Sequence, residues 1–169
     1  MTRPLLPRTG IGYDVHRFQE KRRLVLGGVE IAHTHGLAGH SDADVLLHAI
    51  ADALLGAVAL GDIGQHFPPD DPQWRDMDSR EIVTKAVALL REAGYGPVNI
   101  DATVIAEVPK LLPHAPAMRR AIAGMTGLDA GDVSLKATTN EQMGFVGRRE
   151  GIAAIAVATV APLAAFAEE

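Results

Sequence analysis

The stretch His40-Ser41-Asp42-Ala43-Asp44-Val45-Leu46-Leu47-His48 places two histidines and two aspartates around a predicted helix start. Ser41 is a favoured N-cap residue, and Asp44 three positions later completes a capping-box pattern. Apolar residues then recur at helical spacing, which predicts a helix from about Ser41 to Ala59. Imidazole is neither a preferred helix former nor a good core group. We therefore expect a metal ion to account for His40, just before the helix, and His48, well inside it.

The composition limits what kind of protein this can be. A chain of 169 residues, 47% of them hydrophobic, favours one ordered domain over disorder. The net charge of −5 offers no general attraction to nucleic acid or to an anionic membrane. The sequence has no cysteine, so a metal site must use His, Asp and Glu. No apolar run reaches the ~18–20 residues of a membrane span, and no signal peptide is recognisable, so we expect a cytoplasmic protein.

A second pair of candidate ligands lies in the first predicted strand, residues 9–18. Ile11, Tyr13 and Val15 alternate with polar or small residues, and Asp14 and His16 are two positions apart. In an extended chain such residues project from the same face, which makes Asp14 and His16 a compact two-ligand unit. An exposed pair on an edge strand is the alternative interpretation, and the pair alone does not decide between them.

His48 and two further histidines also have ordinary explanations. Asp44 and Asp52 lie four residues on either side of His48, and either could orient its ring beside a metal. Equally, His48 could be a core histidine whose only partner is one of these aspartates. We expect His33 and His35, which lie in a turn, to be solvent-exposed loop residues.

The remaining pattern predicts an α+β fold. We expect one domain over residues 9–162, with a disordered extension at 1–8 and a tail at 163–169. Strands and helices are interspersed without strict alternation, which favours a two-layer sandwich: a mixed sheet with helices on one face, ferredoxin-like. The long loop at 61–78 is expected to close over a ligand. The other predicted elements are a hairpin at 24–31, helices at 78–93 and 113–125, and strands at 98–107, 133–139 and 151–161, with Val98, Ile100, Ala102 and Val104 on one face.

The loop after the strand at 133–139 has the chemistry of a phosphate site. Thr138, Thr139, Glu141 and Arg148 lie close together in a segment with two glycines. Hydroxyls, a carboxylate and a guanidinium suit a nucleotide phosphate and its metal. An ordinary glycine-rich connection with solvated charges is the alternative.

Several motifs together resemble one family. They are Gly12–Phe18, Gly39–His48, Leu60–Gly64, and Lys136–Thr139 with Glu141 and Gly144-Phe145. In this order they are similar to the 2-C-methyl-D-erythritol 2,4-cyclodiphosphate synthases of the non-mevalonate isoprenoid pathway. The resemblance covers residues 9 to 162 without a sizeable gap, and four motifs in series make it specific.

The resemblance implies a set of ligands and contacts. Asp14, His16 and His48 would bind one zinc ion per subunit, with a substrate phosphate oxygen as fourth ligand. Glu141 would bind a second divalent ion, magnesium or manganese, with the diphosphate. The implied substrate contacts are His40, Ser41, Asp62, Ile63 and Gly64 for the methylerythritol phosphate; Phe67, Pro68, Pro69, Asp70 and Asp71 for closure; Ala106, Glu107, Val108, Pro109, Lys110, Leu111 and Leu112 for cytosine; Thr138, Thr139 and Asn140 for the diphosphate; and Phe145 and Arg148 at the channel.

The resemblance also implies a reaction. The substrate would be 4-diphosphocytidyl-2-C-methyl-D-erythritol 2-phosphate, whose 2-phosphate attacks the β-phosphorus to give the cyclic diphosphate and CMP. Such an enzyme is a phosphorus–oxygen lyase and needs no protein nucleophile. His40 and Thr139 would be the catalytic hydrogen-bond donors that stabilise charge at the reacting phosphorus. Without the resemblance, a water-using phosphodiesterase and a non-catalytic binding protein stay open.

Family members are homotrimers with active sites between subunits. Their central channel is apolar and in some members holds an isoprenoid diphosphate, and Phe145, Arg148 and Glu150 fall at the corresponding positions. The sequence departs from the family at Pro69, where an acidic residue is expected, and at Asn140, which replaces a threonine. Glu107 adds an anion beside the cytosine loop.

Overall fold

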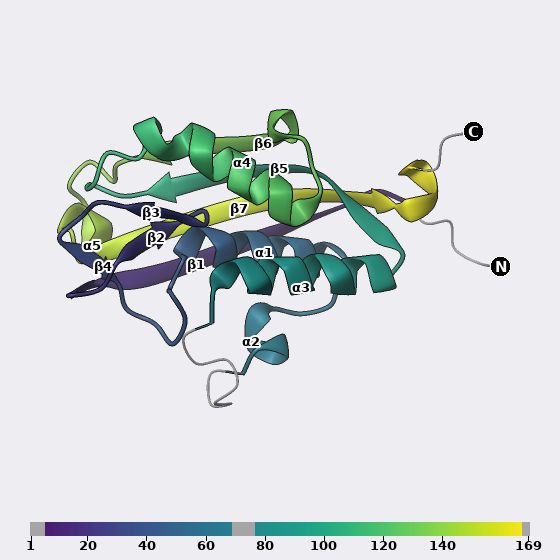
Figure 1. Ribbon diagram of the computed structural model, residues 1–169, viewed down its shortest axis with the longest axis horizontal. Helices are drawn as coiled ribbons and strands as arrows, with labels where there is room; N and C mark the ends of the chain where they lie inside the picture. The colour runs from purple at the N-terminus through teal and green to yellow at the C-terminus, as the bar shows by residue number, and fades with distance from the viewer. Residues whose placement is uncertain (1–5, 69–76, 167–169) are drawn as a thin grey trace.

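The structure is a computed structural model that describes residues 6–68 and 77–166. Its central feature is a five-stranded mixed sheet with strand order β4-β1-β7-β5-β6 (Figure 1). Strands β5 and β6 run parallel, and the other neighbours pair antiparallel. The five strands are β1 (Arg8–Glu20), β4 (His35–Leu37), β5 (Tyr95–Ile105), β6 (Val133–Thr138) and β7 (Gly151–Pro162).

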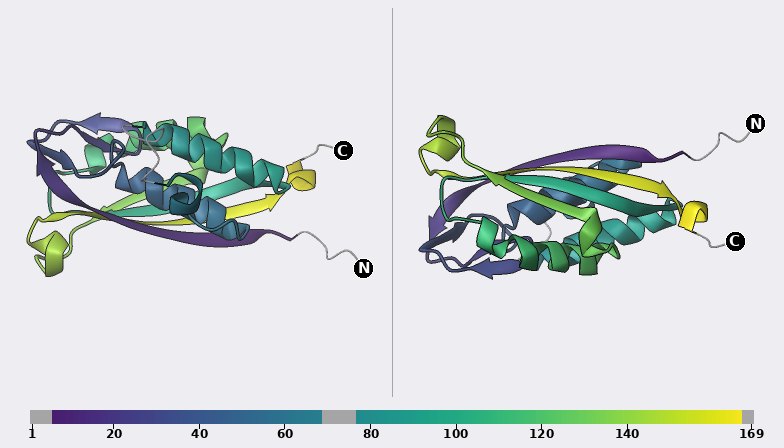
Figure 2. Two further views of the ribbon diagram at one scale, coloured as in Figure 1. Left: turned by 90° about the horizontal axis from the view of Figure 1, so that it is seen from below. Right: turned by 90° about the horizontal axis from the view of Figure 1, so that it is seen from above.

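Three long helices cover one face of this sheet, as Figure 2 shows. They are α1 (Val45–Ala57), α3 (Ser79–Glu92) and α4 (Ala115–Thr126). The predicted α+β architecture, a mixed sheet with helices on one face, is confirmed. The shorter elements are the hairpin β2 (Leu24–Leu26) and β3 (Val29–Ile31), the helices α2 (Ile63–His66) and α5 (Gly144–Gly147), and 3₁₀ turns at Leu112–His114, Ala130–Asp132 and Leu163–Phe166.

The expectation of a ferredoxin-like connectivity is wrong. That motif follows the order β-α-β-β-α-β. Here the long strands and helices follow β-α-α-β-α-β-β, from β1 through α1, α3, β5, α4 and β6 to β7, and the sheet neighbours β5 and β6 lie on either side of α4 in the chain. A helical crossover makes two adjacent strands parallel, whereas a hairpin would make them antiparallel.

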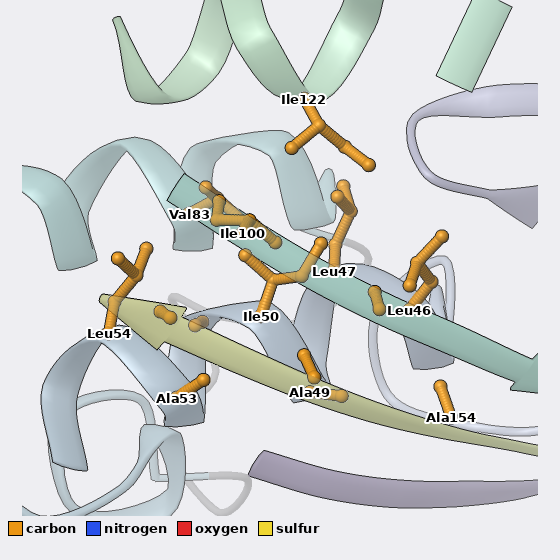
Figure 3. Close-up of a cluster of buried hydrophobic side chains, with 14 of the residues drawn as sticks. Leu46, Leu47, Ala49, Ile50, Ala53, Leu54, Val83, Ile100, Ile122 and Ala154 are labelled. Carbon is orange, nitrogen blue, oxygen red and sulfur yellow. The ribbon is translucent and has the colours of Figure 1, made fainter. Parts of the chain in front are cut away.

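The core lies between the sheet and helix α1, which is buried on almost all sides. Ile50 and Leu54 of α1 meet Val83 of α3 and Ile100 of β5 (Figure 3). The helix can approach β1 closely because β1 has a glycine at the crossing. A Cβ at Gly12 would lie 2.0 Å from the carbonyl oxygen of Ala49. This close approach brings the ligand-bearing faces of β1 and α1 together.

Helix α1 begins later than the capping-box pattern predicts. Its N-cap is Asp44, whose Oδ1 accepts the N–H of Leu47 at 3.1 Å. The same buried carboxylate accepts N–H groups from Gly27 at 2.9 Å and Gly28 at 2.7 Å, in the β2–β3 turn. Ser41 instead accepts the N–H of Ala43 in a turn before the helix. The tertiary contact to the hairpin therefore decides which residue caps the helix.

Other boundaries agree with the sequence to within a few residues, but the loop predicted after residues 133–139 contains α5 and the predicted turn with His33 and His35 runs into β4. Three further predictions need correction. Strand β5 has an irregular register between Pro97 and Asn99, so Val98 is 38% exposed and does not share the buried face of Ile100. Helix α2 lies inside the segment that was expected to be a loop at 61–78. His33 and His35 are half-buried, with ring centroids 5.5 Å and 6.2 Å from that of Phe18, rather than solvent-exposed. No helix in the described part of the chain is long and apolar enough to cross a membrane.

Candidate active site

Three predicted metal ligands meet at one point. Asp14 Oδ2 lies 3.0 Å from both His16 Nε2 and His48 Nδ1, and the two ring nitrogens are 3.2 Å apart. Ligand atoms around a tetrahedral zinc ion with bonds of ~2.0–2.1 Å are about 3.3 Å apart, so these three atoms fit such an ion. Within residues 6–68 and 77–166, this is the one group of three or more His, Asp or Glu residues with that arrangement. We call it the metal trio.

Strand β1 supplies two members of the metal trio. The alternation of β1 directs Asp14 and His16 toward α1, as the sequence pattern predicted. The Nδ1–H of His16 donates to the carbonyl oxygen of Ala38 at 2.6 Å. This bond fixes the proton on Nδ1 and leaves the lone pair of Nε2 directed at the metal trio.

Helix α1 supplies the third member, His48, which is only 6% exposed. The expectation that Asp44 or Asp52 orients this ring is wrong. Asp44 is occupied by backbone N–H groups, and Asp52 accepts the N–H of Ile63 at 2.8 Å. The other ring nitrogen of His48, Nε2, lies 2.9 Å from Ser79 Oγ and 3.3 Å from Ser41 Oγ.

The electrostatics of the metal trio favour an ionised carboxylate. Burial opposes the charge on Asp14, but the imidazoles of His16 and His48, which hydrogen-bond to it when protonated, outweigh burial and hold the pKa of the carboxyl well below its usual range. Burial likewise disfavours a charged His16, yet the hydrogen bond and charge of Asp14 raise the pKa of the imidazole. The trio therefore carries an anionic oxygen beside two imidazoles, which is the donor chemistry of a divalent cation site.

The metal trio opens into a cavity of about 260 Å³. The predicted substrate contacts His40, Ser41, Ile63, Gly64 and Phe67 line it. Asp62 lies beside it as the N-cap of α2, where it accepts the N–H of Gln65 at 3.1 Å. Pro68 is exposed and does not line the cavity. Pro69, Asp70 and Asp71 lie outside the described residues.

Three lining residues of this cavity were missed by the sequence reading: Gly39, Met77 and Ile82. Ile82 lies in the first turn of α3, where helical periodicity assigns an apolar residue to the core, and Met77 lies just before the N-cap Asp78. A local pattern cannot indicate that such a residue also faces a cavity.

A second cavity, of about 490 Å³, lies where β5 and β6 end. Its lining includes two apolar residues that were not predicted, Pro113 and Ala137. Val108 instead lines a separate hollow with Phe18, His33 and His35. The predicted contacts that line the second cavity are Ala106, Glu107, Pro109, Lys110, Leu111, Leu112, Thr138 and Thr139.

Glu107 links the two loops that border the second cavity. Its Oε1 accepts the N–H groups of Asn140 at 3.0 Å and Gln142 at 3.1 Å. Between them Glu141 has a φ of 50°, in the left-handed region. The hydroxyl of Thr139 donates to Glu141 Oε1 at 3.2 Å. The carboxylate of Glu107 thus holds the turn that presents Glu141 and Thr139, a role that its position beside a cytosine loop did not indicate.

The two cavities are separate within one chain and have no lining residue in common. In the sheet, Asp14 pairs with Ala154, Ala154 with Val104, and Val104 with Ala137. Three strand spacings separate β1 from β6, about 14 Å. Moreover, Asp14 points to the helix-covered face of the sheet, whereas the alternation of β6 directs Thr138 to the opposite face.

Phe145 and Arg148 line neither of these cavities. Phe145 is 37% exposed in α5. Arg148 follows α5, and its Nε lies 2.7 Å from Glu150 Oε1. Both residues lie in the segment just before the start of β7 and do not line the cavity of the metal trio.

Comparisons with known proteins agree with this geometry. The model of the YgbB family matches residues 7–161. The 2-C-methyl-D-erythritol 2,4-cyclodiphosphate synthase of Symbiobacterium thermophilum is 62% identical over 152 residues, which cover 90% of this chain and 97% of that protein.

Two solved structures have the same fold. The bifunctional IspDF from Campylobacter jejuni is 42% identical with a TM-score of 0.91, and the match covers 95% of this chain and 43% of that one. The CDP complex of IspF from Plasmodium falciparum is 31% identical with a TM-score of 0.82, covering 95% and 99%. The chain therefore belongs to the YgbB family, the family of the 2-C-methyl-D-erythritol 2,4-cyclodiphosphate synthases.

Proposed function

We propose that this chain converts 4-diphosphocytidyl-2-C-methyl-D-erythritol 2-phosphate to 2-C-methyl-D-erythritol 2,4-cyclodiphosphate and CMP, in the non-mevalonate isoprenoid pathway. The observation that carries the proposal is the metal trio, which opens into a cavity in a chain 62% identical to a synthase of that name. The protein is then a phosphorus–oxygen lyase, active as a single domain over residues 9–162. A cytoplasmic location stays a prediction.

The metal trio is proposed to hold zinc, and Glu141 a magnesium or manganese ion together with the substrate diphosphate. Three protein ligands with a fourth position open are typical of catalytic zinc, and a lone carboxylate with phosphate oxygens suits the harder ions. When bound, these cations neutralise the charge that keeps two phosphate groups apart.

The chain itself positions the substrate and stabilises charge. The bond that forms joins a 2-phosphate oxygen to the β-phosphorus, and the bond that breaks releases CMP. A phosphate is already ionised near neutral pH, so no side chain needs to act as a nucleophile. His40, exposed at the rim of the metal cavity, and Thr139, in the second cavity, are proposed to donate hydrogen bonds to the reacting phosphoryl group.

We further propose a homotrimer with each active site between two subunits. Because the two cavities of one chain share no lining residue and lie about three strand spacings apart, a substrate that spans both needs the second cavity of a neighbouring chain. The uncovered face of the sheet supports such packing. Ile11, Tyr13 and Val15 of β1 are 70%, 54% and 41% exposed, and Ile155 of β7 is 40% exposed beside them. Contiguous apolar exposure of this kind marks an interaction surface.

The same packing supports a central apolar channel. Helix α5, which contains Phe145, projects on the uncovered side of the sheet (Figure 2), and Arg148 and Glu150 lie between α5 and the start of β7. An aromatic ring and a guanidinium there suit the apolar chain and the diphosphate of an isoprenoid diphosphate. Binding of such a molecule in the channel is part of the proposal.

Phosphorus NMR of the purified protein with substrate, zinc and magnesium tests the activity. We expect the resonances of a cyclic diphosphate and of CMP to appear together. Open-chain phosphates instead would indicate a phosphodiesterase that uses water. An unchanged substrate with both metals present would contradict both enzymatic functions and leave a binding protein.

A further inference from the structure

The ring of His48 has a second polar edge, on the side away from the metal trio. Its Nε2 lies 2.9 Å from the hydroxyl of Ser79, the first residue of α3. The Ser79 hydroxyl donates to Asp42 Oδ1, and the Ser79 N–H donates to Asp42 Oδ2 at 3.2 Å. Ser79 is fully buried. A continuous line of hydrogen bonds therefore runs from a carboxylate to a metal ligand.

The direction of these bonds is fixed by the carboxylate. Because Asp42 accepts the hydroxyl proton of Ser79, the Ser79 oxygen is left as an acceptor toward His48. The Nε2 atom of His48 must then carry the proton, and its Nδ1 lone pair faces Asp14 and His16. We infer that Ser79 and Asp42 are positioning residues that hold His48 in the orientation and tautomer that can bind a metal.

A hydrogen bond within the metal trio competes with the one from His48 to Ser79. His48 Nδ1 lies 3.0 Å from Asp14 Oδ2, so a proton on Nδ1 could bond to that carboxylate in the metal-free protein. In that tautomer Nδ1 has no lone pair to offer a metal at the trio. The hydrogen bond to Ser79 favours the other tautomer, and it therefore raises the fraction of protein that is ready to bind a cation.

Ser79 is not explained by an ordinary role in α3. The helix already has an N-cap, since Asp78 accepts the N–H of Arg80 at 2.9 Å. Ser41 is the other hydroxyl near His48 Nε2, but it is farther away, at 3.3 Å, and it also accepts the N–H of Ala43. The ring of His16, by contrast, is held by a backbone carbonyl, which no substitution removes. His48 is therefore the ligand whose support can be tested by mutation.

The test compares zinc affinity among full-length variants. We expect Ser79→Ala to weaken zinc binding by about 10–100-fold in competition with a chromophoric chelator, the usual effect of losing a hydrogen bond behind a metal ligand. Ser79→Thr keeps the hydroxyl and should retain most of the affinity. Thr84→Ala removes an exposed hydroxyl from the same helix and should change nothing. In cobalt-substituted protein, the visible bands should change in Ser79→Ala and not in Thr84→Ala.

Asp42→Asn provides the answer if Ser79→Ala does not fold. The amide oxygen can still accept from the hydroxyl, but the group carries no charge and its NH2 cannot accept the N–H of Ser79, so we expect a loss of zinc affinity that does not exceed that of Ser79→Ala. The inference would be overturned if the folded Ser79→Ala variant kept the zinc affinity and the cobalt bands of the wild type. If only Asp42→Asn folds, the same result in that variant would overturn it. A loss of affinity in Ser79→Thr as large as that in Ser79→Ala would also overturn it. The inference rests on the proposed metal site, and a wild-type protein that binds no zinc would contradict that site instead.

Discussion

Gly12 lies where α1 crosses β1, two residues before the metal ligand Asp14. A Cβ there would lie 2.0 Å from the carbonyl oxygen of Ala49 and 2.8 Å from the amide nitrogen of Ala53, both backbone atoms of α1. Gly12→Ala must therefore push the helix away from the strand and His48 away from Asp14. We expect a loss of about 1–3 kcal/mol in the free energy of unfolding, measured with urea on metal-free protein.

Gly124 provides the matched control for this substitution. It lies within α4, and a Cβ there would have no neighbour within 4 Å. Gly124→Ala should stabilise the protein by about 0.5–1 kcal/mol, because alanine favours a helix interior more than glycine does. Equal stabilities for the two variants would mean that the approach of α1 to β1 is not limited by Gly12.

From the sequence alone, a residue of the candidate site could be placed only where a local pattern fixes the direction in which its side chain projects. Alternation along β1 was enough to place Asp14 and His16 on one face. The hydroxyl behind His48 was not predictable, because Ser79 is 31 residues away and reaches the ring only when α3 packs against α1. Asp44 and Asp52 have the helical spacing that would let them contact His48, yet their carboxylates accept hydrogen bonds from backbone N–H groups instead.

At the level of elements, the carboxylate of Asp44 joins α1 to the β2–β3 hairpin. Burial raises the pKa of Asp44 to about 6, although three backbone N–H groups hydrogen-bond to its oxygens. The pKa is thus higher in the folded than in the unfolded protein. The stability from this group is fully present below about pH 4 and is lost as the pH rises through about 6.

Asp44→Asn should reveal this loss. Asparagine does not ionise, so the free energy of unfolding of the wild type relative to the variant should fall by about 2 kcal/mol between pH 4 and pH 6.5. Urea unfolding of both metal-free proteins across this range measures it. Other titrating groups are shared and cancel in the difference. A difference that stays constant with pH would show that Asp44 is ionised throughout.

Glu107 is a link between the loops that follow β5 and β6. Its carboxylate accepts the N–H groups on both sides of Glu141. Glu107→Ala leaves this turn unsupported, and we expect CDP to bind about 10-fold more weakly in calorimetry, the equivalent of one lost hydrogen bond to a charged group. Glu107→Gln keeps an acceptor oxygen and should bind CDP nearly as well as the wild type. Equal weakening in both variants would mean that the charge matters rather than the turn.

The elements themselves were predictable to different degrees. The ends of α3 and α4 depend on local caps, the side chain of Asp78 and the left-handed Gly127, and both were placed within two residues. The start of α1 was misplaced because a hairpin that lies earlier in the chain selects Asp44 as the cap. The parallel pairing of β5 with β6 was also missed, because strand order depends on how the whole sheet assembles.

At the scale of the whole molecule, the proposal that the uncovered face of the sheet forms the trimer interface can be tested by mutation. Ile155 lies at its centre, paired with Tyr13 of β1 on one side and Thr103 of β5 on the other. Ile155→Glu would bury an unpaired charge in the proposed trimer. We expect this variant to sediment as single chains and to lose activity. It should keep its zinc, because the metal trio lies on the other face.

Thr84→Glu adds the same charge to the exposed side of α3 and should sediment like the wild type. A trimeric Ile155→Glu variant would exclude this face as the interface.

The separation of the two cavities within one chain leads to a sharper prediction. His48→Ala breaks the metal trio, and Thr139→Ala removes a donor in the second cavity, so each variant alone should have at most about 1% of wild-type activity. In mixed trimers, some interfaces combine the intact trio of one variant with the intact second cavity of the other. Random mixing in equal amounts makes about a quarter of the interfaces complete, so about a quarter of the wild-type activity should return.

Co-refolding the two inactive variants and measuring CMP release tests this directly. A mixture of His48→Ala with His16→Ala is the control, since both break the same trio and no interface can be complete. If each active site were formed by one chain, neither mixture would recover activity. Recovery in the first mixture alone therefore requires the metal trio of one subunit to act with the second cavity of its neighbour, as expected from the separation of the two cavities within one chain.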